Sequence, residues 1–143
     1  MGSRKKATKK QRISPKEMHE QALRLYREGR MEEALEKLRI TLKEEENSER
    51  WNDWAAVQHA LGATQNAETG FRRALELDKN NQEAAANLGC VLVGLGRYVE
   101  AGPFLMVALN TTDAAKRAAV EGLIAKISKA TSAAETVAVP PKG

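Results

Sequence analysis

Residues 62–78 read GATQNAETGFRRALELD, and this stretch decides the fold class. Five residues after Gly62 comes Ala67, and Phe71 and Leu75 follow at intervals of four. This spacing places the three apolar side chains on one side of a helix. A glycine ahead of them is typical of a turn that ends a preceding helix. The stretch therefore predicts a tight turn followed by a helix with one apolar face.

The same pattern occurs three times in the chain. Four markers recur together at a period of about 34 residues, a length typical of helical repeats. The markers are Gly29, Ala34, Leu38 and Leu42 in the first set, Gly62, Ala67, Phe71 and Leu75 in the second, and Gly96, Ala101, Leu105 and Leu109 in the third. A period of this length indicates stacked units that bury apolar surface against their neighbours.

Each unit is expected to hold two helices joined at its glycine. Residues 14–17, Ser-Pro-Lys-Glu, form a capping-box motif with proline at the first helical position, so the first helix should begin there. The second unit is expected to start near Ser48, and Asn80 with Glu83 to form a capping box that opens the third. The predicted bounds are near 15–47, 48–81 and 82–114.

A further helix is predicted at 114–129, capped by Asp113. It carries an apolar stripe at helical spacing, made of Val120, Leu123, Ile124 and Ile127. An array of helices must cover the apolar face of its last unit, so this helix is expected to act as a cap.

Pro103 lies inside the expected second helix of the third unit. Proline has no N–H, so it removes the hydrogen bond that the Val99 carbonyl would accept. We expect a kink there, or a helix whose first turn begins later than in the other units.

The repeat resembles the tetratricopeptide repeat (TPR) family over residues 15–114. The motifs that carry the likeness are Ala85-x-x-Leu88-Gly89-x-x-Leu92 and Ala67-x-x-x-Phe71. The proline that closes the family's units is replaced here by Glu46, Lys79 and Asp113. The resemblance implies an all-α fold, a right-handed superhelical array of antiparallel helix hairpins with about seven helices.

Charge divides the chain into a basic tail and a mildly acidic body. The chain has 143 residues and a formal net charge of +4. Residues 1–12 contain six cations and no anion, whereas the remainder holds 17 cations and 19 anions. The cations are Arg4, Lys5, Lys6, Lys9, Lys10 and Arg12. Residues 1–12 are predicted to be a disordered tail, 13–130 the repeat domain and 131–143 a flexible C-terminal tail.

Composition favours closely packed helices and gives no sign of a membrane span. Aromatic residues make up 4% of the chain, whereas alanine occurs 23 times. No apolar run approaches the roughly 20 residues that a membrane helix needs, so a cytoplasmic location is expected.

The sequence predicts no catalytic residue, no cofactor and no metal site, so we expect the chain not to be an enzyme. Cys90 is the single cysteine and is expected to be a small buried hydrophobe. His19 and His59 are expected at the surface or in a groove, because a metal site would need further ligands. Trp51 and Trp54 are expected to be buried between hairpins.

The resemblance implies that the first helices of the units line a concave, peptide-binding face. The residues placed there as partner-binding are Lys16, His19, Leu23, Tyr26, Arg27, Asn52, Ala56, His59, Ala86, Cys90 and Val93, accompanied by Glu49, Ala60, Glu83 and Gly94. The apolar end of this face could equally pack against the C-terminal helix or a second copy of the chain. Family members that clamp the C-terminal carboxylate of heat-shock chaperones use cations and amides at positions occupied here by His19, Leu23, Asp53, Glu83 and Asn87, so such a clamp is not expected.

The expected function is that of a protein-binding adaptor or scaffold that holds a peptide or helix of a partner. Two alternatives stay open. The chain could be the N-terminal TPR portion of a larger enzyme, such as a glycosyl- or methyltransferase. It could also associate with nucleic acid through the basic tail, whose cations would neutralise phosphates. A homo-oligomer is compatible with all three.

Overall fold

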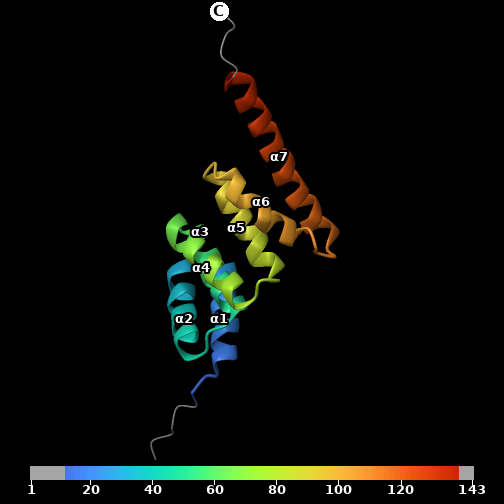
Figure 1. The fold of residues 1–143 in the computed structure, drawn as a ribbon. Helices are drawn as coiled ribbons and strands as arrows, with labels where there is room; N and C mark the ends of the chain where they lie inside the picture. The colour runs from blue at the N-terminus through green and yellow to red at the C-terminus, as the bar shows by residue number, and fades with distance from the viewer. Residues whose placement is uncertain (1–11, 139–143) are drawn as a thin grey trace, which may run out of the picture.

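The computed structural model of the chain describes residues 12–138, which form seven helices and no strand (Figure 1). The all-α prediction and the number of helices are confirmed. The helices are α1 Pro15–Arg27, α2 Met31–Glu44, α3 Ser48–Ala60, α4 Thr64–Leu77, α5 Gln82–Gly94, α6 Tyr98–Ala108 and α7 Ala114–Ala138. The predicted basic tail, apart from Arg12, lies outside the described residues.

The capping box predicted for the first helix is present. Ser14 Oγ accepts a hydrogen bond from Glu17 N at 3.2 Å, and Glu17 Oε2 accepts one from Ser14 N. The capping box predicted at Asn80 is wrong, because Asn81 caps α5 by accepting from Ala84 N at 3.0 Å. Asn80 instead donates its N–H to the Asp78 carboxylate in the turn before the helix. This turn shifts the start of α5 by one residue.

The three marker glycines end the first helix of each pair. Gly29, Gly62 and Gly96 have φ values of +79°, +79° and +75°, a region that other residues rarely adopt. In the first turn, Arg30 N donates to Leu25 O and Gly29 N to Tyr26 O, and the other two turns repeat both bonds. These bonds satisfy carbonyls that the helix end would leave unpaired. The glycine period therefore predicts the hairpins correctly.

Packing follows the order of the helices along the chain. α1 packs on α2, α3 on α4 and α5 on α6, while α2–α3 and α4–α5 contacts join the hairpins. Apolar side chains of the first hairpin and Val57 form one core cluster, and the rest of the array forms a second. Trp54 packs against both clusters, as predicted for a core tryptophan. Trp51 is half-buried, lies in neither cluster and donates its indole N–H to Glu46, so its predicted burial is wrong.

α6 accommodates Pro103 without a delayed start. The helix begins two residues after Gly96, the same offset at which α2 and α4 follow their glycines, so the expected late start is wrong. It ends early instead, with 11 residues against 14 in each of its counterparts. This shorter helix still places Ala101, Leu105 and Ala108 in the core.

α7 is capped as predicted but is longer than predicted. Asp113 Oδ1 accepts hydrogen bonds from Ala115 N and Lys116 N at 2.9 and 3.0 Å. Val120 is buried, and the rest of the apolar stripe packs partly buried against the larger core cluster. The helix continues to Ala138, so residues 131–138 are helical and not the predicted flexible tail. The C-terminal part of α7 reaches beyond the other helices (Figure 1).

Among the described helices, none combines the length and the apolar character that crossing a membrane would require.

Candidate functional site

Two hollows open on the side of the first helices and meet at α5. The α5–α7 hollow, of about 530 Å³, is lined by Gln82, Glu83, Ala86, Asn87, Cys90, Ala108, Thr111, Lys116, Ala119, Val120 and Leu123. The central hollow, of about 240 Å³, is lined by Tyr26, Ala56, His59, Ala60, Phe71, Asn87 and Cys90. Asn87 and Cys90 line both, so we call the two hollows together the groove.

The groove exists because small side chains face it. Ala56 and Ala60 on α3, and Ala86 on α5, leave space that larger residues would fill. The buried Phe71 ring contributes to the wall of the central hollow. At the other end, α7 supplies a second apolar wall, which makes the α5–α7 hollow a cleft between two helices.

The structure places five of the predicted partner-binding residues in the groove lining: Tyr26, Ala56, His59, Ala86 and Cys90. Cys90 is exposed there, so its predicted burial is wrong. The helix turns its side chain toward the groove, away from the core positions of α5. Ala60 and Glu83, named with the same face, also line it.

The other predicted residues do not line the groove. Lys16 and Arg27 are exposed outside it, as are Glu49 and Gly94, and Leu23 is half-buried. Val93 is 5% exposed because it faces the core of the array, which corrects its placement on the binding face. Asn52 is 2% exposed and accepts a hydrogen bond from the Asn87 amide at 3.0 Å. Its amide group joins α3 to α5 and is not free for a partner.

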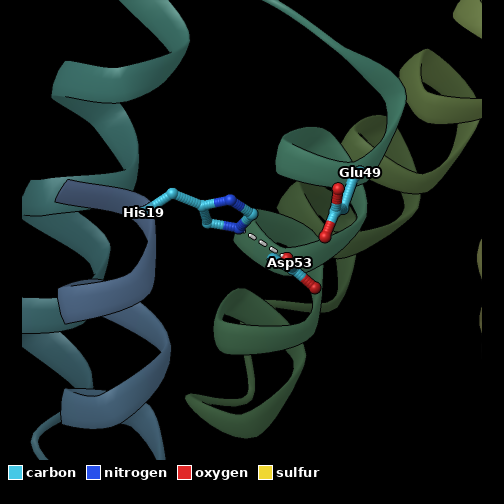
Figure 2. Close-up of side chains that lie close together, drawn as sticks. All are labelled: His19, Glu49 and Asp53. Carbon is cyan, nitrogen blue, oxygen red and sulfur yellow. Dashed lines mark hydrogen bonds and ion pairs between the residues drawn. The ribbon is translucent and has the colours of Figure 1, made fainter. Parts of the chain in front are cut away.

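His19 is also buried, which corrects its expected place at the surface or in a groove. Only 8% of the residue is exposed, and its Nε2 lies 2.7 Å from Asp53 Oδ2 on α3 (Figure 2). The sequence resemblance matched His19 and Asp53 to positions that hold a carboxylate ligand in the chaperone-binding members of the TPR family. Here the two side chains bind each other.

Sequence reasoning missed the contribution of the C-terminal region to the groove. Its lining residues beyond α5 are Ala108, Thr111, Lys116, Ala119, Val120 and Leu123. The apolar stripe of α7 predicts a cap and nothing more. The crossing of α7 over α5 opens a hollow beside the capped surface, and the spacing of apolar residues carries no information on that crossing.

Charged networks lie mainly away from the groove. A third hollow, of about 650 Å³, is lined by Thr64, Gln65, Glu68, Thr69, Leu95 and Arg97. Hydrogen bonds from Arg97 and Arg72 lower the pKa of Glu68, and the same two arginines lower the pKa of Glu100. The two charged residues that line the third hollow, Glu68 and Arg97, are therefore already paired with each other.

Comparison with known proteins identifies the fold. No family model matches the sequence, and no curated protein sequence matches it. Among solved structures, the chain is similar to the first TPR of Spaghetti (RPAP3) bound to the HSP90 peptide SRMEEVD, with a TM-score of 0.74 and 18% identity over 82% of this chain and 93% of that one. It is similar to the TPR2B domain of yeast Sti1, solved as a complex with pHsp70, with a TM-score of 0.73 and 17% identity over 80% and 96%.

A longer solved structure has a similar fold. Yeast Tom70 matches with a TM-score of 0.68 and 16% identity over 85% of this chain, which spans about a quarter of Tom70 (26%). At these identities the likeness concerns the fold. Taken with the three glycine-turned hairpins and the C-terminal cap, it shows that the chain has the structure of a tetratricopeptide repeat domain.

Proposed function

We propose that the chain is a non-catalytic adaptor that binds an extended or helical peptide of a partner protein in the groove. The observation that carries the proposal is that the two hollows share Asn87 and Cys90 in their linings, both on α5. A solved TPR domain with the same fold holds an HSP90 peptide, and another is in complex with pHsp70, which supports this use of the fold.

The lining of the groove defines the kind of peptide. Alanine, valine and leucine side chains of α5 and α7 favour an apolar anchor in the α5–α7 hollow. Of its polar lining residues, Gln82 offers a side-chain amide to a peptide backbone, whereas the Asn87 amide already donates to Asn52 and Thr111 is 8% exposed. We expect the acidic HSP90 peptide SRMEEVD to bind poorly, because the chain places Asp53 and Glu83 where a carboxylate would need cations or amides.

The single cysteine allows a direct test. Peptides would be selected from a random display library, and their affinities measured by fluorescence anisotropy before and after alkylation of Cys90 with N-ethylmaleimide. Because the adduct would fill the junction of the two hollows, we expect the affinity to fall by at least about tenfold, which is about 1.4 kcal/mol. SRMEEVD serves as the comparison peptide.

A matched control moves the adduct away from the groove. The variant Cys90→Ser with Glu32→Cys carries its only thiol on the exposed first turn of α2. Its alkylation should leave the affinity unchanged. Full affinity of the selected peptides for the chain alkylated at Cys90 would show that the groove is not the binding site, and tight binding of SRMEEVD would contradict the predicted peptide class.

A further inference from the structure

Three side chains with metal-binding atoms converge where the first hairpin meets the second. His19 comes from α1, and Glu49 and Asp53 come from α3, and their candidate ligand atoms all lie within 4.8 Å of one another (Figure 2). Glu49 and Asp53 are four positions apart, so they project from one face of the helix. The group has no local sequence motif, because its members belong to two different units of the repeat.

The protein itself satisfies only part of the cluster. The His19 imidazole donates a hydrogen bond to the half-buried Asp53, which accounts for the burial of the imidazole. Glu49 is different: within residues 12–138 its carboxylate has no hydrogen bond or ion pair to another side chain. The Glu49 carboxylate therefore lies, without a side-chain partner among residues 12–138, beside the hydrogen-bonded pair His19 and Asp53.

We propose that His19, Glu49 and Asp53 bind a divalent first-row metal ion, of which Zn²⁺ is the best fit. One imidazole nitrogen and two carboxylate oxygens form a mixed set that suits Zn²⁺, whereas Mg²⁺ and Ca²⁺ prefer oxygen ligands alone. The two carboxylates balance the charge of the ion. Water would complete a four-coordinate site.

Small side-chain movements would assemble the site. Ligand atoms around a tetrahedral Zn²⁺ lie about 3.3 Å apart, given metal–ligand distances of about 2.0–2.1 Å. The widest separation in the cluster is at most 4.8 Å, and the exposed Glu49 side chain is free to rotate inward. The imidazole proton would move from Nε2 to Nδ1, which leaves the Nε2 lone pair to bind the ion. The ion would then link α1 to α3.

The repeat supplies an internal control. Shifted by one repeat, the positions of His19, Glu49 and Asp53 correspond to Asp53, Glu83 and Asn87 at the next junction. That junction has no imidazole, and an amide replaces one carboxylate. Glu49→Gln and Glu83→Gln therefore make the same chemical change at equivalent positions, of which only the first belongs to the proposed site.

The experiment titrates the full, untagged chain with ZnCl₂ and measures binding by isothermal titration calorimetry. Co²⁺, which absorbs visible light, serves as a spectroscopic substitute for Zn²⁺. We expect one equivalent of Zn²⁺ to bind. Loss of an outer-shell partner weakens metal binding by roughly 10- to 100-fold. Glu49→Gln and Asp53→Asn each remove a direct ligand, so each should weaken Zn²⁺ binding by more than that. Glu83→Gln and His59→Ala should bind as the parent does, and Mg²⁺ should not compete.

Circular dichroism would check that each variant is folded. Should Asp53→Asn unfold the chain, Glu49→Gln decides the question alone, because it alters an exposed side chain. Absence of saturable binding at one equivalent overturns the proposal. So does binding that survives Glu49→Gln or disappears in His59→Ala, since either result would place the metal elsewhere.

Discussion

At position 89 a methyl group would collide with Leu105. A Cβ built on Gly89 would lie 2.4 Å from Leu105 Cδ2 and 2.9 Å from its Cγ, and the Leu105 side chain is fully buried. Overpacking of this kind costs about 1–3 kcal/mol, more than the roughly 1 kcal/mol that alanine gains over glycine in a helix. We expect Gly89→Ala to lower the free energy of unfolding by up to about 2 kcal/mol, measured by urea denaturation.

Gly94 is the matched control on the same helix. A Cβ there would meet no atom within 4 Å. Gly94→Ala should therefore be neutral or stabilising by up to about 1 kcal/mol. Equal stabilities of the two variants would show that α5 and α6 can separate enough to admit the methyl group.

The residue scale also shows what the repeat pattern cannot predict. The period places His19, Asp53 and Asn87 at equivalent positions of the three units. It does not reveal that His19 reaches Asp53, or that Asn87 reaches Asn52 instead of Asp53. Those contacts depend on the offset between neighbouring first helices, which is set by packing of the whole hairpins. The predicted burial of Cys90 fails for a related reason, because its place beside core residues does not determine its side of the helix.

At the level of elements, an ionic network joins α4 to the start of α6. Arg97 bonds to both Glu68 and Glu100, and Arg72 bonds to the same two carboxylates. Glu68 is the inner member, with 19% of its side chain exposed, and hydrogen bonds from Arg97 and then Arg72 lower its pKa from the ordinary 4.5. We expect Glu68→Gln to reduce the free energy of unfolding at pH 7 by about 1 kcal/mol.

The pH dependence follows from the direction of that shift. A carboxylate whose pKa is lower in the folded state stabilises the fold above its unfolded pKa, and this contribution is lost as the pH falls through the folded value. Chemical denaturation of both proteins at pH 7 and in acid below the unfolded pKa should therefore show the difference shrinking in acid. A difference independent of pH would mean that the substitution acts through packing. Glu32→Gln, on an exposed site of α2, should change little at either pH.

α7 divides into a docked part and a projecting part. Val120 is 3% exposed and belongs to the larger core cluster, whereas residues 131–134 are exposed. Val120→Ala removes two buried carbon atoms at about 0.8 kcal/mol each, so we expect the free energy of unfolding to fall by about 1.5–2 kcal/mol.

A chain ending after Ala130 should keep its free energy of unfolding within about 0.5 kcal/mol. Thermal or urea unfolding would compare them, and a large loss on truncation would show that the projecting part also stabilises the cap.

The elements differ in how well their sequences predict them. Hairpin turns were predictable because each requires a glycine at positive φ, a local constraint. The end of α7 was not, because the alanine-rich residues after Lys129 continue the helix with no stop signal before Pro140. The groove is harder to predict from the sequence than either of these. Its α5 wall follows from the repeat, but its α7 wall depends on how a non-repeated helix crosses the array.

In the whole molecule, Trp54 connects the two core clusters by packing against both. The first hairpin packs with Val57 in one cluster, the remaining helices form the other, and Trp54 contacts both. Its ring also fills the space above Gly70, where a Cβ would lie 2.8 Å from Trp54 Cε3. In an array whose units contact only their neighbours, loss of the Trp54 side chain should selectively weaken the interface between the first hairpin and the rest.

We therefore expect Trp54→Ala to cost about 2–4 kcal/mol and to uncouple α1 and α2 from the rest. Amide hydrogen exchange should show the α1–α2 amides losing more protection than those of α5 and α6. Trp51→Ala is the control, because Trp51 meets Trp54 only edge-on, with ring centroids 5.4 Å apart, and should cost about 0.5–1.5 kcal/mol. An equal loss of protection in all hairpins would mean that the array unfolds as one cooperative unit, with both clusters sharing a single stability.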